Sequence, residues 1–489
     1  MIRRASLVVA CAAATASAGS PWGKSGISDW TKVPPPGAEP TFRPPVPVRE
    51  RLANGLTVLV IENHALPIVA MELVVPGAGA ADDPAGQGGL AALTADLLDE
   101  GAGGRTALEL AEEEDRLGAE LDLGVDSDAA YISAHALAKT FAPTLALMTS
   151  VVTRPAFDAK ELARVQGDRL TSLEQRRDRP REVAGILLHA ALYGPGSAYG
   201  HPDDGGRDEL AKLALPDARR FYATHWNPAA MTLVVAGDVD RRTLRAQLDA
   251  GLGAWRPAAA VRPALPVAAA ARLAHRLLLA NRPGAEQSDV RIGLVGPLRS
   301  DPRYFAFEVM ANALGGGFTS RLEQRLREQL GITYGVVAGM DWRLASGPFQ
   351  ITSAIQTPST ARGITEALQI VGGLASADLP AAELDNAKQN LIRALPALFD
   401  TDSATASTFG ELALLRLPDD FYTRYAAEVR TVTAADVRAV AAALVPQDQL
   451  VIAVVGDLAK IRAELDKLKL GDPALFDLYG LPLGAATGQ

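Results

Sequence analysis

The chain has 489 residues, of which 48% are hydrophobic and 21% charged, and its formal net charge is −9. This length and apolar content predict a globular protein of two to three domains with a sizeable core. Because phosphate binding relies on clustered Lys and Arg side chains, the acidic balance argues against a nucleic-acid partner.

The first 18 residues predict a secretory signal peptide. Arg3 and Arg4 precede an apolar run, and small residues follow at 16–18. No later stretch is long and apolar enough to predict a membrane span, so we expect the mature chain in the periplasm. Cys11 is the single cysteine, which excludes an intramolecular disulfide. In the alternative interpretation "LVVAC" is a lipid-attachment box, and an acylated Cys11 would hold the chain at a membrane.

A proline-rich arm follows the signal over residues 19–48 and favours an extended, unpacked conformation. The folded part starts near Arg49. Two β-rich runs within 54–75, on either side of a turn at 62–67, predict a β-hairpin.

The glycine-flanked stretch 88–104 predicts a helix that ends at Gly101. Four leucines are spaced to bury one stripe of this helix: Leu90, Leu93, Leu97 and Leu98. The positions that would project into a site hold Ala92, Ala95 and Asp96, and alanine offers no chemistry.

A capping box at Thr106 and Glu109 predicts the start of the next helix, which stops at Gly118. Residues 121–137 then alternate like a half-buried strand. Helical segments lead to an apolar strand at 231–239.

Helix, proline, apolar strand and Gly-Asp follow one another twice, at 216–239 and again at 433–458. This repetition predicts two similar halves, and hairpins mixed with long helices predict α+β sandwich domains. The predicted divisions are a signal peptide (1–18), an arm (19–48), a first domain (49–256), a linker (257–272), a second domain (273–470) and a tail (471–489).

Two common hydrolytic sites find no support in the sequence. No two of the six histidines lie three to five residues apart, so no helical histidine pair for zinc exists. The nucleophile elbow G-x-S-x-G is also absent.

The segment 314–336 is richer in polar chemistry. Gly315, Gly316 and Gly317 would suit a phosphate cradle or a hinge, but the preceding segment is helical and no Lys-Ser or Lys-Thr follows. The glycines are therefore interpreted as a hinge or loop, not as a phosphate site.

Beyond the glycines, Ser320 and Glu323 predict a capping box for a helix that ends before a strand. Arg327 at the end of this helix and Tyr334 on the strand would together form a clamp for a carbonyl oxygen that gains negative charge. In the alternative interpretation Arg327 pairs with Glu323 one turn earlier and no clamp forms.

These stretches together resemble the insulinase and pitrilysin family of zinc metallopeptidases, the inverted zincins. Residues 88–101 resemble the family's G-L-A-H-F-L-E-H-M helix, 227–239 its domain-closing strand and 315–336 its second-domain motif. The resemblance implies two homologous domains that form half of a clamshell chamber for unfolded peptides.

By this resemblance the zinc site has been lost. The family's H-x-x-E-H supplies two zinc ligands and a general base, and here Ala92, Ala95 and Asp96 stand in those places. The third ligand, a glutamate, is replaced by Thr171 or its neighbour Ser172. We expect no catalytic residue, no metal and no cofactor in this chain alone.

The second-domain motif is retained, so the resemblance gives Arg327 and Tyr334 the role of holding the substrate. This contrast predicts a heterodimer in which a homologous partner carries H-x-x-E-H and the zinc ion, and in which this chain alone is inactive. The first alternative is a structural or peptide-binding pseudoenzyme without a role in proteolysis. The second is an active peptidase with carboxylate ligands around Asp96, Asp99 and Glu174.

Overall fold

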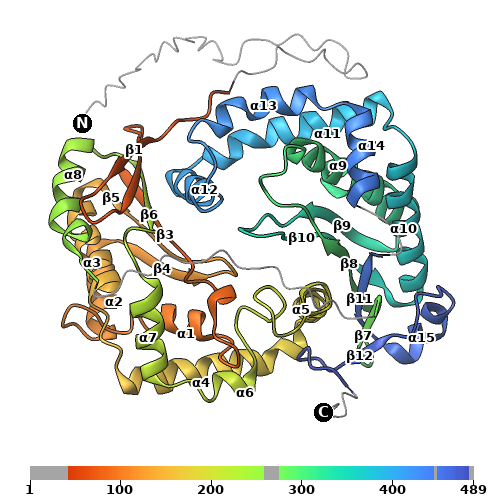
Figure 1. Cartoon of the computed structure of the whole chain (residues 1–489), viewed down its shortest axis with the longest axis horizontal. Helices are drawn as coiled ribbons and strands as arrows, with labels where there is room; N and C mark the ends of the chain where they lie inside the picture. Colours follow the sequence, from red (N-terminus) through yellow and green to blue (C-terminus); the bar gives the residue numbers. More distant parts are fainter. Residues whose placement is uncertain (1–41, 258–274, 445–448, 484–489) are drawn as a thin grey trace, which may run out of the picture. The chain divides into compact units, whose positions relative to one another are not determined.

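The computed structural model describes residues 42–257, 275–444 and 449–483. The predicted signal peptide, Cys11, nearly all of the arm and nearly all of the linker lie outside the described residues. Within the described ranges, no helix combines the length and the apolar character needed to cross a lipid bilayer. The described residues from Pro44 onward belong to one compact unit with two six-stranded mixed sheets (Figure 1).

The strands of the first sheet lie in the order β1-β2-β6-β3-β5-β4. Their bounds are β1 Val48–Arg51, β2 Thr57–Glu62, β3 Ile68–Pro76, β4 Glu120–Val125, β5 Ala129–Leu137 and β6 Thr232–Gly237. The second sheet has the order β12-β7-β11-β8-β10-β9. Its strands are β7 Leu277–Asn281, β8 Gln287–Val295, β9 Thr333–Met340, β10 Pro348–Gln356, β11 Val451–Gly456 and β12 Ala474–Phe476.

The two sheets repeat one topology, which confirms the predicted α+β fold with two similar domains. The closing strands of the repeat, β6 and β11, occupy the same third position. Each of them pairs parallel with one neighbour and antiparallel with the other. The sheets differ at the first edge, where β1 runs antiparallel to β2 but β12 runs parallel to β7.

The predicted hairpin over 54–75 is wrong. Strands β2 and β3 do form on either side of the turn, but β6 lies between them and pairs with both. Both strands are buried on both faces over most of their length, as central strands are, which fits a neighbour on either side. The turn is visible in the local sequence, whereas the insertion of β6 is a long-range pairing.

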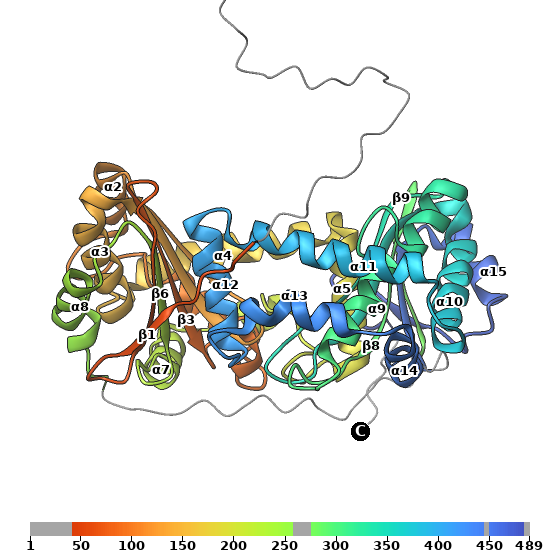
Figure 2. The ribbon, with the colours of Figure 1, turned by 90° about the horizontal axis from the view of Figure 1, so that it is seen from above.

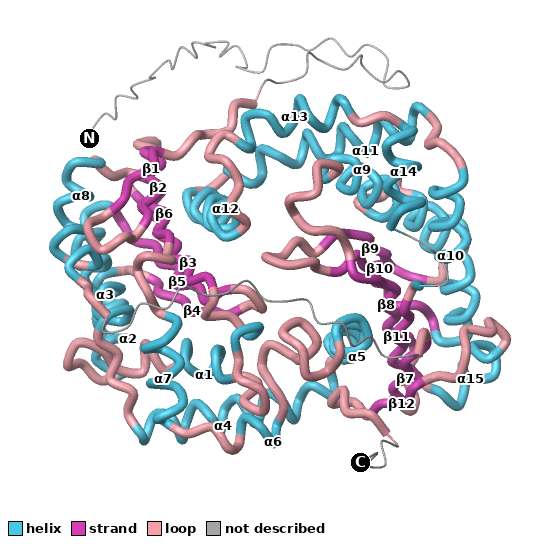
Figure 3. Tube along the Cα trace, in the orientation of Figure 1, coloured by secondary structure: helices cyan, strands magenta, loops and turns pink. Residues whose placement is uncertain are grey.

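Helices surround the two sheets (Figure 3). Those of the first half are α1 Leu90–Asp96, α2 Ala107–Leu117, α3 Phe141–Thr153, α4 Ala159–Gln175, α5 Pro180–Tyr193, α6 Arg207–Leu210, α7 Leu215–His225 and α8 Arg241–Ala250. Those of the second half are α9 Tyr304–Gly315, α10 Thr360–Ser376, α11 Ala381–Ala394, α12 Asp402–Leu414, α13 Phe421–Thr431, α14 Ala434–Leu444 and α15 Leu458–Asp466.

The ends of two helices, α1 and α2, can be compared with the ends predicted from the sequence. In α2 the capping box of Thr106 and Glu109 forms, and Gly118 closes the helix at a φ of 59°, which confirms the prediction. Helix α1 has the predicted buried leucine stripe, but it ends at Asp96 and not at Gly101. Residues 97–100 form turns instead of a further helical turn.

Each half of the chain contributes one helix that packs on the sheet of the other half. Helix α5 packs on β8 and β11, where Val183 and Leu187 join Leu278 and Val455 in one apolar cluster. Helix α12 packs on β3 and β6, and its Phe409 lies in the largest apolar cluster with residues of both sheets (Figure 2). Burying one such side chain stabilises the fold by about 1.5–3 kcal/mol. The exchange therefore joins the halves through their cores.

A buried hydrogen-bond group adds to this junction. The Tyr199 hydroxyl donates to Asp128 Oδ1 at 2.6 Å, and the Leu344 N–H donates to Asp128 Oδ2 at 2.8 Å. The Ala345 N–H donates to the same Tyr199 hydroxyl at 3.1 Å. Asp128 and Tyr199 are only 4% and 2% exposed, so neither of these two side chains has bulk water as a ready substitute for its partner.

We expect Asp128→Ala to lower the free energy of unfolding by about 2–3 kcal/mol, because it leaves the buried Tyr199 hydroxyl and Leu344 N–H without their acceptor. Urea denaturation followed by circular dichroism measures the change. Asp122→Ala, at an exposed position of β4, is the control and should change the value by less than about 0.5 kcal/mol. Equal effects of the two substitutions would contradict a structural role for Asp128.

Candidate functional site

Helix α1 carries the positions at which the resemblance expects zinc ligands. Its first residue is Leu90, because Gly89 adopts a left-handed conformation with a φ of 87°. The half-buried Asp83 carboxylate accepts hydrogen bonds from the N–H groups of Gly89 and Ala91, both at 2.7 Å. A carboxylate at this end also suits the positive end of the helix dipole. Asp83 thus fixes the start of the helix.

An ion pair occupies the place where the zinc site is expected. Ala92 and Ala95 are buried and carry no donor atom. Asp96 Oδ2 accepts a hydrogen bond from Arg169 Nε of helix α4 at 2.6 Å. Arg169 is largely buried, with a side chain 18% exposed, and its Nη1 also lies 3.4 Å from Asp204. Asp96 is therefore a partner of an arginine.

Further charged groups surround this ion pair. Arg164 forms ion pairs with three carboxylates, namely Glu100, Glu161 and Asp168. Asp99 has no such partner: burial, with a contribution from the Glu100 charge, raises its pKa to about 7. Two arginines thus pair with most of the carboxylates at the end of α1, and Asp99 is left without an ion pair among the described residues.

The positions expected to hold the third ligand also bond elsewhere. The Thr171 hydroxyl donates to the carbonyl of Gly167 at 2.9 Å, within its own helix. Glu174 forms an ion pair with Arg207 at 3.1 Å.

These residues do not fit a zinc ion. A tetrahedral site needs three protein ligands. Of the three expected ligand positions, Ala92 has no donor atom, the Thr171 hydroxyl bonds within its own helix, and Asp96 lies against a guanidinium that repels a divalent cation. In the described ranges, no group of three His, Cys, Asp or Glu side chains is placed to hold a metal. The alternative with carboxylate ligands at Asp96, Asp99 and Glu174 gains no support from this geometry.

The glycine triplet ends helix α9 where it meets β9. A Cβ atom on Gly315 would lie 2.4 Å from the backbone nitrogen of Ala338, and one on Gly316 would lie 2.6 Å from the Cα of Asn312. Gly317 has only an ordinary contact at 3.7 Å. The first two glycines thus permit close packing of backbone on backbone, while a hinge at this point stays a prediction.

The predicted capping box of Ser320 and Glu323 does not form. Residues Glu323–Gln329 wind as a π-helix, and the Ser320 hydroxyl is buried without a hydrogen-bond partner. Glu323 Oε1 instead accepts a hydrogen bond from the Val336 N–H of β9 at 3.1 Å. The Glu323 carboxylate therefore links the helix to the following strand by a hydrogen bond instead of capping the helix.

Arg327 lies in the π-helical segment and Tyr334 lies on strand β9, the two elements that the Glu323–Val336 hydrogen bond joins. Arg327 Nη1 is 3.9 Å from Glu323 Oε2 and its Nε is 3.5 Å from Glu328, so both ion pairs are loose. Its guanidinium carbon lies 4.9 Å from the centre of the Phe318 ring. Tyr334 is 87% exposed. Among the described residues no hydrogen bond or ring contact joins Arg327 to Tyr334, and their predicted role as a clamp stays a prediction.

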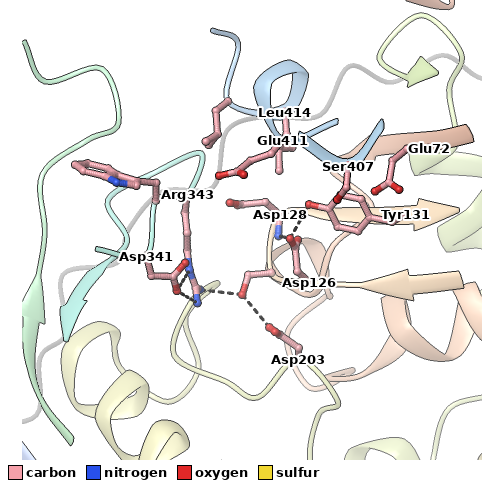
Figure 4. A pocket seen from close by; sticks show the side chains of 13 residues that line it. Glu72, Asp126, Asp128, Tyr131, Asp203, Asp341, Arg343, Ser407, Glu411 and Leu414 are labelled. Atoms are coloured by element: carbon pink, nitrogen blue, oxygen red, sulfur yellow. Dashed lines mark hydrogen bonds and ion pairs between the residues drawn. The ribbon is translucent and has the colours of Figure 1, made fainter. Parts of the chain in front are cut away.

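Sequence reasoning missed a cavity of about 470 Å³ between β3, the β4–β5 turn, the β9–β10 loop and α12 (Figure 4). We call it the acidic cavity. Its ionisable side chains include one arginine, Arg343, and six carboxylates: Glu72, Asp126, Asp128, Asp203, Asp341 and Glu411. They come from five separate segments without a common motif, so no local signal predicts that they meet.

Several of these carboxylates have partners. Arg343 donates from Nη2 to Asp341 Oδ2 at 2.7 Å and from Nη1 to the Ser127 hydroxyl at 2.8 Å. The Ser127 hydroxyl in turn donates to Asp203 at 2.9 Å. The two oxygens of Asp128 accept the hydrogen bonds of the interdomain junction. These bonds leave Arg343 as the single cation among six acids.

Glu72 differs from the other acids because it is both buried and without a hydrogen-bond or ion-pair partner among the described residues. It lies in the middle of β3, is 9% exposed and makes no side-chain hydrogen bond or ion pair with any described residue. Burial raises its pKa from the ordinary 4.5 to about 7. Glu72 is therefore an acid that is costly to ionise in the folded chain.

This shift predicts a pH dependence of stability. The folded state binds a proton at Glu72 between pH 4.5 and 7 that the unfolded state has lost, so stability falls as the pH rises through this window. We expect Glu72→Gln to be about 2–3 kcal/mol more stable than the wild type at pH 8 and equal to it near pH 4. Urea denaturation at both values tests this, with the exposed Glu112→Gln as control. A gain independent of pH would contradict the assignment.

The comparisons with known proteins agree with this architecture. Residues 57–199 match the family model described as Insulinase (Peptidase family M16). Residues 212–391 match the model described as Peptidase M16 inactive domain. An uncharacterised zinc protease of Mycobacterium tuberculosis is 27% identical over 372 residues, which are 75% of this chain and 84% of the relative. A non-peptidase homologue of Helicobacter pylori is 24% identical, over 74% of this chain and 82% of the relative.

Solved structures share the fold. A peptidase M16 inactive domain from Pseudomonas fluorescens aligns with a TM-score of 0.77 and 26% identity, over 84% of this chain and 97% of that chain. A chain of complex III2 from Candida albicans aligns with a TM-score of 0.72 and 17% identity, over 86% and 99%. The fold and the α1 site define an inactive-type protein similar to zinc proteases. The chain belongs to the insulinase family of peptidases, M16.

Proposed function

We propose that this chain is the non-catalytic subunit of a heterodimeric, extracytoplasmic zinc peptidase. It binds an unfolded peptide and supplies Arg327 and Tyr334 to the active site of a homologous partner that carries H-x-x-E-H. The observation that supports this most is a contrast between two sites. Asp96 is neutralised by Arg169 at 2.6 Å, whereas Tyr334 is 87% exposed and Arg327 has only loose ion pairs.

The chemistry of these two residues suits a peptide bond under attack. A guanidinium and a phenol are donors for a carbonyl oxygen that becomes an oxyanion, and such donors are most effective when they are held in place beforehand. Zinc in the partner would polarise the same carbonyl and activate water. Bringing the two sets of groups to one peptide converts two weak sites into one competent site.

The position of Tyr334 also suits an extended substrate. Its strand β9 is the edge of the second sheet and pairs with β10 on one side only. An unpaired strand edge offers backbone N–H and C=O groups to an extended peptide. An unfolded segment that paired there would pass the Tyr334 side chain.

The experiment measures cleavage of a quenched, unstructured peptide by this chain, by an H-x-x-E-H homologue from the same cell, and by their mixture. The proposal expects cleavage only in the mixture. A mixture that cleaves no faster than the homologue alone would overturn it.

That second outcome would favour the structural or peptide-binding pseudoenzyme. One relative is itself named a non-peptidase homologue, and the fold is similar to that of a chain of complex III2 from Candida albicans. Size-exclusion chromatography of the mixture separates the two cases, because a scaffold would still form a complex without adding activity.

A further inference from the structure

We propose that a cavity on the first half of the chain binds a small organic anion, a carboxylate or phosphate group on an apolar body. The cavity has a volume of about 570 Å³ and lies between helices α2, α3 and α8 and the loop that precedes α2. We call it the α3 cavity. It shares no lining residue with the acidic cavity and contains neither Arg327 nor Tyr334, so the inference does not depend on the proposed function.

The α3 cavity carries a positive charge. Its ionisable side chains are Arg105, Arg154 and Glu113. Glu113 is already paired, because Arg116 of the same helix donates to both of its oxygens, at 2.6 and 2.7 Å. Neither Arg105 nor Arg154 forms an ion pair with a carboxylate of the described residues, and the side-chain hydrogen bond of Arg154 goes to the Ser150 hydroxyl at 3.1 Å. Two guanidiniums at one cavity therefore lack an anion.

The backbone holds these two arginines close together. The N–H groups of Ala102 and Arg105 each donate to the carbonyl of the other residue at 3.0 Å, across a turn of Gly103 and Gly104. The Gly103 N–H donates to the Arg154 carbonyl at 2.9 Å. The two glycines have φ values of 61° and 87°, which glycine adopts without strain. Because this turn is fixed, an anion between the two guanidiniums needs no backbone rearrangement, and each guanidinium offers paired N–H donors.

Two buried polar atoms in the wall of the cavity have no hydrogen-bond partner in the described ranges: Thr149 Oγ1 and Gln247 Oε1. Thr149 differs in this from its neighbours on α3. The hydroxyls of Thr144, Ser150 and Thr153 each donate to the carbonyl four residues earlier, at 2.9, 3.0 and 2.6 Å. A buried polar group without a partner costs free energy. Rotation about one side-chain bond would turn either group toward a ligand in the cavity.

The remaining wall of the cavity is mostly apolar. A Cβ atom on Gly251 would lie 3.2 Å from Thr149 Oγ1, so the lack of a side chain at 251 keeps this part of the cavity open. The volume is that of a site for a small molecule and not for a bare ion. The ligand thus combines an anionic group at the arginines with an apolar body of several carbons. The apolar lining residues are Ala142, Pro143, Leu145, Ala146, Leu147 and Ala250.

The charge of the neighbouring helix favours a free molecule over the headgroup of a lipid in a membrane. Acidic lipids make a bilayer surface negative, and acids on the protein repel such a surface. A free molecule reaches the two guanidiniums without bringing an extended negative surface close to α2. The acids of α2 are Glu109, Glu112, Glu113, Glu114 and Asp115.

The test is isothermal titration calorimetry of the full purified chain with octanoate, octyl phosphate and 1-octanol, at concentrations at which all three are monomeric. The three compounds share one apolar chain and differ in the head group. We expect each anion to bind at least tenfold more tightly than octanol, because only an anion pairs with the guanidiniums. Arg105→Gln and Arg154→Gln should each weaken binding of the anions about tenfold and leave binding of octanol within twofold.

Arg242→Gln is the matched control, because Arg242 is an exposed arginine of α8 that does not line the cavity. It should leave binding of the anions within twofold of the wild type. Ala146→Phe, at an exposed position of α3, places a ring in the cavity and should abolish binding of all three compounds, with circular dichroism as the check that the variant is folded.

Equal binding of octanoate and octanol, or equal effects of Arg154→Gln and Arg242→Gln, would overturn the proposal. Binding of the chain to phosphatidylglycerol vesicles without binding to the free anions would also overturn it, because the ligand would then be a lipid in a membrane. None of these results depends on a catalytic partner, so the split peptidase is tested separately.

Discussion

Replacing Arg327 by alanine is expected to lower kcat/KM of the mixed peptidase about a hundredfold. Removing one preorganised donor from an oxyanion site costs about 10²–10³ in rate. The loss should fall mainly on kcat, because the donor acts on charge that develops only in the transition state. Tyr334→Phe, which removes only the hydroxyl, should have a smaller effect of about tenfold.

Arg325→Ala is the matched control for this experiment. Arg325 lies in the same π-helical segment, but its guanidinium donates to both oxygens of Glu366, at 2.8 and 2.9 Å. It is therefore occupied within the chain, and its removal should change kcat/KM by less than about twofold. If Arg325→Ala and Arg327→Ala reduce activity equally, the effect is structural and the assigned role of Arg327 is wrong.

Restoring zinc ligands to α1 should fail while Arg169 is present. The variant Ala92→His, Asp96→His and Thr171→Glu has the family's ligand types, but Arg169 would then lie beside the metal without its partner Asp96. We expect the further substitution Arg169→Gln to strengthen zinc binding at least tenfold, because it removes a partly buried positive charge. Competition with a chromophoric zinc chelator measures the affinity.

Arg207→Gln in the same background is the control for that comparison. Arg207 has a side chain 66% exposed and pairs with Glu174, not with Asp96. Its removal lowers the net positive charge equally but should change zinc affinity by less than about twofold. Equal increases in zinc affinity from the two substitutions would mean that Arg169 has no specific effect on zinc binding at this position.

Local features were predictable from the sequence. The capping box and closing glycine of α2 depend on neighbouring residues, and the repeated closing unit identified β6 and β11 in advance. The hairpin failed because β6, contributed from some 160 residues later in the chain, enters between its two strands. No local pattern records such an insertion.

In the candidate sites too, local features were predictable from the sequence, and contacts between distant segments were not. The loss of histidines at 92 and 96 can be read from the sequence, but the replacement ion pair with Arg169 depends on the packing of α4 against α1. The capping box at Ser320 failed because a backbone N–H of β9 competes for Glu323. The acidic cavity was not predictable, because Glu72 and Glu411 are brought together only by the exchanged helix α12.

The exchange of α5 and α12 also determines how the chain unfolds. A fragment ending at residue 256 would lack α12 and leave Ala70, Val234 and the Glu72 side of the first sheet open to water. A fragment starting at 275 would lack α5 over its own sheet. Neither half is a separate folding unit, although the sequence repeats itself. The two sheets are therefore expected to lose their structure in one cooperative transition, and folding must wait for contacts between residues hundreds of positions apart.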